Sequence, residues 1–487
     1  MQKIWDTSEV LVKNAFNELK TLFKSKVFYV YLLISALIIP SIFFDGVIFV
    51  VLGIAFACSI IFKEEDVFAL LMFLYPFFAV FISSGKNWYF YLFAVSVAVM
   101  SVKFLIKVFK KQKTIDWFVV CLIAAYVLFL ILPIRKNSLG EFSNNCNITN
   151  ISSVGVFFVA LYLCYKNREK INFLKIVRIF VVGFIVSGLF GLLVFCSDKI
   201  QSVMALIYYH GFDLQRYNGL FVQPNTLAII SSVVFALVLY LFYNKKFGLE
   251  THVYLIASFT LGYVTLARSF LYAAAICFAV YLIAEIVRDK KNFYKFVLPF
   301  VIEIGLVMLI CFAHSKVHFQ RAGVSDLVNG YENVSIENPT TDFVDPGRGG
   351  LIKIYLKDFL SSVLVILFGR GISYEWFGTF SSHNTYLQAF WNTGVVGVVL
   401  LLVIACAFVK MFTNLKFKNL LKEIFTDLSL YFLLIPILAI MFIENLFMNM
   451  QMIIVILSVV FAIIEAKRKM FNEQSQETEN IEEKKKI

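Results

Sequence analysis

Residues 382–402 read SHNTYLQAFWNTGVVGVVLLL and join a polar loop to a long run of apolar residues. The run extends to residue 411, which is long enough for a helix that crosses a hydrocarbon core of roughly 30 Å. His383 lies at the start of this segment, directly after a long polar stretch in an otherwise apolar chain. The segment therefore predicts a membrane helix with a histidine at its N-terminal end. We expect any chemistry to be located here.

The composition of the whole chain indicates a polytopic membrane protein. Hydrophobic residues make up 60% of the chain and charged residues only 16%, which leaves too little polar surface for a soluble protein of 487 residues. We expect an all-α fold with about 12–14 transmembrane helices. The predicted spans are residues 27–44, 46–62, 67–82, 88–105, 115–134, 151–165, 174–196, 225–242, 251–267, 270–287, 296–312, 393–411, 428–447 and 450–464.

Positive charge gathers in every second connection between these spans, as the positive-inside rule requires. The basic connections are residues 3–26, 63, 107–113, 166–170, 245–246, 288–295, 410–422 and 467–469. Both termini are therefore predicted to be cytoplasmic, with an amphipathic segment at 1–26, a single transmembrane domain at 27–465 and a disordered tail at 466–487. The net charge of +12 is then an orientation signal. It suits a lipid bilayer as partner, and we expect no binding of nucleic acid.

The connection at 314–384 is predicted to lie on the extracytoplasmic side and to contain one further helix. Its first part is polar, but residues 351–367 return to an apolar rhythm that Lys353, Lys357 and Asp358 interrupt. Such a pattern favours an amphipathic helix at the membrane surface over a span. The loop is thus expected to cap a cavity that opens toward both lipid and water.

Arginines on the predicted outer face need their own explanation, because that face is otherwise poor in cations. Arg216 lies in a polar loop before a span, Arg268 in a short turn between two spans, and Arg348 in the long loop. A guanidinium offers several donors in a rigid fork that suits phosphate or carboxylate oxygens. Two or three at one interface suggest an anionic ligand. A membrane-boundary anchor for Arg268, a solvated loop residue for Arg216 and a loop ion pair for Arg348 are the alternatives.

Five segments, taken in order, resemble the O-antigen ligase and polymerase superfamily of bacterial envelope proteins. They are RYNGLFVQPNTLA at 216–228, ARSFL at 267–271, GRGGL at 347–351, FGRG at 368–371 and HNTYLQAFWNTGVVG at 383–397. The resemblance covers roughly residues 174–402, and the segment that begins at His383 is its most specific part. The first six predicted spans carry no motif of the family.

The resemblance implies a membrane-embedded, metal-independent, inverting glycosyltransferase of the bacterial cytoplasmic membrane that needs no cofactor. Such enzymes transfer a glycan from undecaprenyl pyrophosphate to an acceptor sugar hydroxyl at the outer face. Arg216 and Arg268 would hold the donor pyrophosphate, and His383 would orient or deprotonate the acceptor hydroxyl. Further contacts with phosphate or glycan are expected from Arg348, Arg370, Asn384, Tyr374 and Trp376.

Three functions stay open from the sequence. A ligase would move a finished glycan to lipid A core in lipopolysaccharide assembly, whereas a polymerase would join lipid-linked repeat units of O-antigen or capsule. A transporter or flippase of lipid-linked oligosaccharide would instead place polar groups near the bilayer midplane. In this sequence the polar and charged groups collect at the predicted outer rim instead. Separately, Glu303 lies inside a predicted span, where an ionisable residue is by default a candidate for function. For this carboxylate a buried structural hydrogen bond is favoured over a functional role.

Overall fold

The computed structural model describes residues 26–41, 44–83, 86–111, 148–167, 171–196, 217, 219–221, 224–243, 250–265, 267–313, 347–370, 382–413, 428–443 and 457. The first group of elements is α2 (Lys26–Ser41), α3 (Asp45–Ile61), α4 (Glu64–Leu74), the 3₁₀ helix η1 (Tyr75–Phe81), β1 (Ile82–Ser83), β2 (Lys86–Asn87), α5 (Trp88–Lys111), α7 (Ile148–Lys166) and α8 (Phe173–Cys196). The second group is α10 (Pro224–Tyr243), α11 (Glu250–Val264), α12 (Arg268–Arg288), α13 (Tyr294–Ala313), α15 (Gly347–Phe359), α16 (Val363–Phe368), α17 (Thr385–Thr413) and α19 (Leu428–Ile443).

Almost all of these elements are helices, and five of them are long and apolar enough to cross a membrane by length and composition. These five are α5, α8, α10, α12 and α17. Shorter apolar helices are found in α2, α3, α7, α13 and α19. The prediction of a helical membrane protein is confirmed at this level. The count of 12–14 spans stays a prediction, because residues 115–134 and most of 450–464 lie outside the described residues, as do 1–25 and the tail at 466–487.

Two predicted helices are divided in the structure. The span predicted at 67–82 is α4 followed by η1, with non-helical torsion angles at Phe77. Pro76 lies at this point, and a proline inside a helix removes a backbone donor and clashes with the preceding turn. The surface helix predicted at 351–367 is likewise two helices, because Ser362 caps α16 by accepting a hydrogen bond from the amide of Val365 at 3.3 Å.

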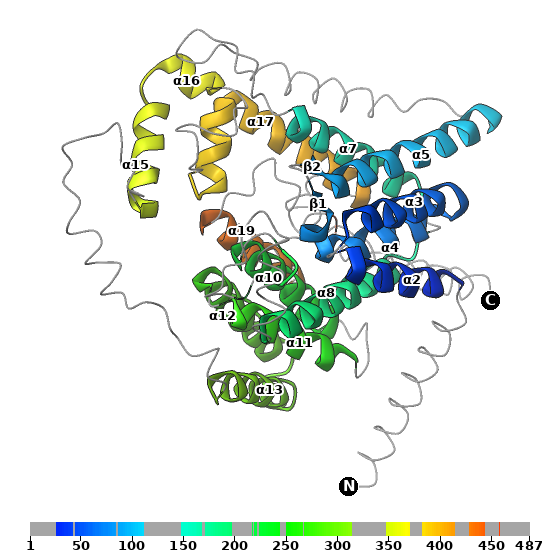
Figure 1. Cartoon of the computed structure of the whole chain (residues 1–487). Coiled ribbons are helices and arrows are strands. Elements are labelled where there is room, and N and C mark those ends of the chain that lie inside the picture. The colour runs from blue at the N-terminus through cyan, green and yellow to red at the C-terminus, as the bar shows by residue number, and fades with distance from the viewer. Residues whose placement is uncertain are drawn as a thin grey trace, which may run out of the picture.

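Helix α10 forms the centre of the second group. Its residues from Thr226 to Leu241 are buried on every side, in keeping with a sequence that is apolar around its whole circumference. It packs against α11, α12 and α19, as Figure 1 shows. The hydroxyl of Ser232 donates to the carbonyl of Ala228 at 2.7 Å, so this buried polar group is satisfied within the helix.

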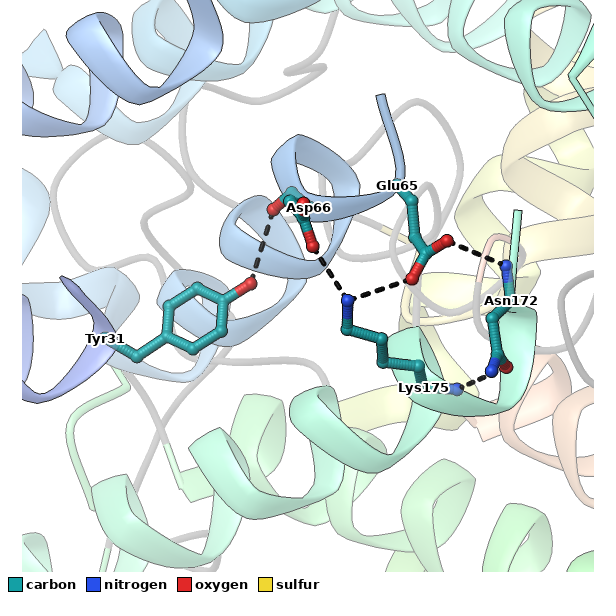
Figure 2. A network of polar contacts seen from close by, with 5 residues as sticks. All are labelled: Tyr31, Glu65, Asp66, Asn172 and Lys175. Atoms are coloured by element: carbon teal, nitrogen blue, oxygen red, sulfur yellow. Dashed lines mark hydrogen bonds and ion pairs between the residues drawn. The ribbon is translucent and has the colours of Figure 1, made fainter. Parts of the chain in front are cut away.

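Charged residues join α2, α4 and α8 at the end of the bundle that the sequence predicts to be cytoplasmic (Figure 2). The Lys175 ammonium lies 2.9 Å from Glu65 and 2.8 Å from Asp66, and the Tyr31 hydroxyl donates to the carbonyl of Asp66. Asn172 caps α8 by accepting from the Lys175 amide, while its own amide donates to Glu65. These carboxylates therefore hold the start of α8 against the start of α4.

Glu303 of α13 has a partner on α11. Its carboxylate lies 2.7 Å from Nδ1 of His252, whose ring meets the ring of Phe242 edge to face. A hydrogen bond is therefore present, although the pair is partly buried and not fully buried. The structural role favoured from the sequence stays a prediction. The bond joins α13 to the bundle at a position where an isolated carboxylate would be costly in lipid.

Candidate functional site

The turn before α12 presents Arg268 at a helix N-terminus. Thr265 is fully buried and shapes this turn, because its hydroxyl donates to the carbonyl of Gly262 and accepts from the amide of Ala267. Ala267 precedes the helix and cannot supply a side-chain cap, and the first turn of α12 carries no acidic residue. The start of α12 therefore combines free amide donors, the positive end of a helix dipole and an exposed guanidinium.

Arg268 differs from the other arginines whose side chains the structure describes. Each of those is paired with a carboxylate, namely Arg178 with Glu250, Arg288 with Glu285 and Arg370 with Asp358. Within the described part of the chain, no group hydrogen-bonds to or pairs with the Arg268 guanidinium. Since an arginine keeps its charge at any working pH, this exposed fork is available to an anion.

His383 lies in a short loop that is fixed by its neighbours. Its φ of +48° is unusual for a residue with a side chain, and such strained conformations gather at functional sites. On one side, the amide of the buried Ser382 donates to Gln388 at 3.1 Å. On the other, Asn384 caps α17 by accepting from the amide of Leu387 at 2.9 Å. The half-buried histidine is therefore held between two anchored residues.

Asn384, which is also a predicted contact residue, connects this loop to α19. Its side-chain amide donates to the carbonyl of Phe442 at 3.2 Å. The next turn adds a second link, because the Tyr386 hydroxyl donates to Leu438 and its ring lies 4.6 Å from that of Phe442. The end of α19 thus supports the start of α17.

The same end of α19 lies close to Arg268. Ile440 packs with Ala273 of α12 and Ile229 of α10. Ala273 follows Arg268 by five residues, which is about 7.5 Å along a helix. These contacts therefore bring the starts of α12 and α17, with Arg268 and His383, near the same end of α19.

The peptide that follows Arg216 is anchored at this end as well. The buried Tyr217 donates to the carbonyl of Gly188 in α8, and Gly219 adopts a φ of +59°. Gly188 in turn lies against Leu261, one turn before the end of α11. Arg216 itself lies outside the described residues, and so do Tyr374 and Trp376. Their predicted roles stay predictions.

Arg370, another predicted contact residue, forms a bidentate ion pair. Its Nε and Nη2 donate to Asp358 at 2.9 and 2.7 Å, and the indole of Trp391 donates to the same carboxylate at 2.9 Å. The Arg370 amide also donates to the carbonyl of Trp391 at 2.8 Å. These contacts favour a structural role in which Arg370 fastens α15 to α17. Arg348 belongs to the first turn of α15, and its side chain is outside the described part.

Two glycines let α16 and α17 approach closely. Gly394 interrupts α17 with φ +66° and ψ −177°, and a side chain there would overlap the backbone of Leu367 and Phe368. Gly369 has a φ of +71° and is packed in the same way against Asn392 and Thr393. Glycine is required at both positions by the backbone conformation and by the space. The FGRG and HNTYLQAFWNTGVVG segments are therefore parts of one packed unit.

Sequence reasoning missed the residues that hold this unit together. In the sequence, Asp358 stands out only as a polar interruption of an apolar rhythm. In the structure its carboxylate accepts hydrogen bonds from the side chains of Arg370 and Trp391. Gln388 and Asn392 are buried and hydrogen-bonded to each other at 2.8 Å. Their spacing of four residues in an apolar helix could have predicted this bond, because buried side-chain amides need hydrogen-bond partners. Nothing in the described residues forms a cluster of three or more His, Cys, Asp or Glu that could hold a metal ion.

Comparison with known proteins adds no relative, since no protein-family model matches the chain and no curated protein matches it.

Proposed function

We propose that the protein is a membrane-embedded glycosyltransferase that acts as an O-antigen ligase on an undecaprenyl-pyrophosphate-linked glycan. One observation carries this proposal. Arg268 is exposed, has no partner among the described residues, and begins a helix at the end of the bundle where His383 also lies. A pyrophosphate is the anion that a guanidinium at a helix N-terminus suits.

The chemistry follows from these two groups. His383 accepts the proton of the acceptor hydroxyl, whose oxygen attacks the anomeric carbon of the donor sugar from the face opposite the pyrophosphate. The bond between that carbon and the pyrophosphate oxygen breaks, and the leaving group departs as undecaprenyl pyrophosphate. Arg268 and the amides of the first turn of α12 stabilise the negative charge that develops on the leaving oxygen. The reaction inverts the anomeric centre and needs no oxidant or metal.

Replacing Arg268 by Ala tests the proposal in the native host and in nanodiscs supplied with lipid-linked glycan. Loss of one charge-stabilising donor is expected to lower kcat by about 10²–10³-fold. Arg268→Lys should recover part of this loss, because it keeps the charge without the fork. Arg178→Ala is the matched control, since it removes an arginine that is already paired with Glu250.

The lipid-linked pool separates the two enzymatic functions. In cells with Arg268→Ala or His383→Ala, long chains that accumulate on the lipid carrier support the ligase. Single repeat units that accumulate there instead indicate a polymerase, which needs the same two groups. Unchanged surface glycan and an unchanged lipid-linked pool in both variants refute the proposal of a glycosyltransferase.

A further inference from the structure

The helices α15 and α16 form an elbow, residues 347–368, which packs on α17. The inner face of α15 consists of Ile352, Tyr355 and Phe359, which pack with Leu387 and Trp391 of α17. The rings of Tyr355 and Trp391 are 5.0 Å apart. Figure 1 shows α15 beside the first part of α17, with α16 near the bend. Tyr355 is buried in this contact, and Ile352 and Phe359 are partly buried.

The outer face of the elbow is apolar and exposed. Five large apolar residues are each 39% to 70% exposed. They are Leu356, Leu360, Val363, Leu364 and Leu367. Leu356 lies near the end of α15 and Leu360 follows it by one turn, directly after the helix, and the other three lie on α16. We call these five side chains the patch. Exposed apolar side chains gathered on one short element mark an interaction surface.

The position of the patch indicates what covers it. Leu367 lies against Gly394, where the second part of α17 begins. Beyond that point α17 exposes Val395, Val399 and Leu402 along one of the five segments able to cross a membrane. The elbow patch therefore continues the surface that α17 presents to lipid.

Charge complements this arrangement. Lys353 and Lys357 are exposed on the same side of α15 as Leu356 and Leu360. Asp358, the nearby acid, is turned inward and holds Arg370. The outer face therefore carries two exposed lysines on α15 beside the apolar side chains, which is the pattern of an element that lies at a membrane surface rich in anionic lipid.

We propose that the elbow is a lipid-docking element that inserts its five apolar side chains among the acyl chains of the adjacent leaflet, while Lys353 and Lys357 bind anionic phospholipid headgroups. On its other side the elbow packs on Trp391 of α17 and binds Arg370 through Asp358. Docking in lipid would thus hold the first part of α17, which follows His383, against the membrane surface. The inference does not depend on the reaction that the site performs.

Tryptophan fluorescence of the full chain in vesicles tests this inference. Leu364→Trp places a probe on the patch at an exposed position that tolerates the larger side chain, and Leu402→Trp places the matched probe on the lipid-facing side of α17. The emission of the five native tryptophans is subtracted with the unmodified protein. In vesicles of phosphatidylglycerol brominated on its acyl chains, the Leu364→Trp emission should fall by as large a fraction as the Leu402→Trp emission.

Two other outcomes overturn the inference. Quenching of Leu364→Trp by aqueous acrylamide without quenching by brominated lipid shows that the patch faces water. Protection from both quenchers shows that protein covers the patch, such as a second copy of the chain.

Mixed vesicles test the lysines. Brominated phosphatidylglycerol mixed with ordinary phosphatidylcholine should quench the Leu364→Trp probe strongly. Brominated phosphatidylcholine mixed with ordinary phosphatidylglycerol should quench it less. In Lys353→Gln/Lys357→Gln this preference should disappear, because the headgroup contacts are lost. A preference that persists in the double variant removes the lysines from the proposal.

Discussion

Replacing Gly394 by Ala should destabilise the unit formed by α16 and α17. The glycine has φ +66° and ψ −177°, a region that residues with a side chain rarely occupy and that costs on the order of 1–3 kcal/mol. The added methyl group would also overlap the backbone of Leu367 and Phe368, which is unable to move as a flexible side chain would. Overpacking adds about 1–3 kcal/mol, so the expected loss is about 2–6 kcal/mol.

The measurement is equilibrium unfolding of the purified protein in mixed micelles, followed by tryptophan emission. Gly53→Ala is the matched control, because this glycine lies inside α3 and a side chain there has no heavy atom within 4 Å. It should leave stability unchanged or raise it by up to about 1 kcal/mol. If Gly394→Ala unfolds within about 0.5 kcal/mol of the unmodified protein, the argument that the two glycines set the approach of α16 and α17 is wrong.

Three further predictions concern charged contacts. Asp358→Ala should cost on the order of 3 kcal/mol in unfolding free energy, because it leaves the Arg370 guanidinium partly buried and unpaired, and an unchanged value would contradict this. Glu303→Ala should lower the unfolding free energy by about 1–2 kcal/mol and Glu303→Gln by less, since an amide can still bond to His252. An unchanged unfolding free energy in Glu303→Ala would show that the bond does not stabilise the fold. Burial raises the pKa of Glu64. The hydrogen bond from Lys107, a backbone hydrogen bond and the positive charges of Lys107 and Lys103 together outweigh burial and hold the pKa below its usual value. The carboxylate therefore stabilises the fold above about pH 4.3, and this contribution is lost as the pH falls through the lowered pKa. An acid titration of stability should be shallower for Glu64→Gln than for the unmodified protein.

Much of the helical framework could be predicted because it depends on local properties of the chain. Helices α8, α10, α12 and α13 begin and end within a few residues of the predicted spans, since length and apolarity decide whether a segment can replace water by lipid. The break between α4 and η1 was missed, although Pro76 was a visible reason for it.

The candidate site was predictable in its residue types and only partly in its geometry. Arg268 and His383 were chosen from their places at helix starts, and the structure puts both starts at one end of the bundle. Arg370 is expected from the family resemblance to contact phosphate or glycan, but its guanidinium binds Asp358, twelve residues earlier. That pairing depends on the break between α15 and α16, which brings the two residues face to face.

The sequence by itself determined that this chain is a bundle of apolar helices, because hydropathy and helix length are properties of single segments. It also predicted that Arg268 lies in a turn between two apolar segments and that His383 precedes another. The tertiary structure alone decided that α10 is enclosed on all sides, that α19 links the starts of α12 and α17, and that Arg268 lacks a partner among the described residues while Arg370 has one. These outcomes depend on contacts between segments far apart in the chain, where small differences in packing select one neighbour over another.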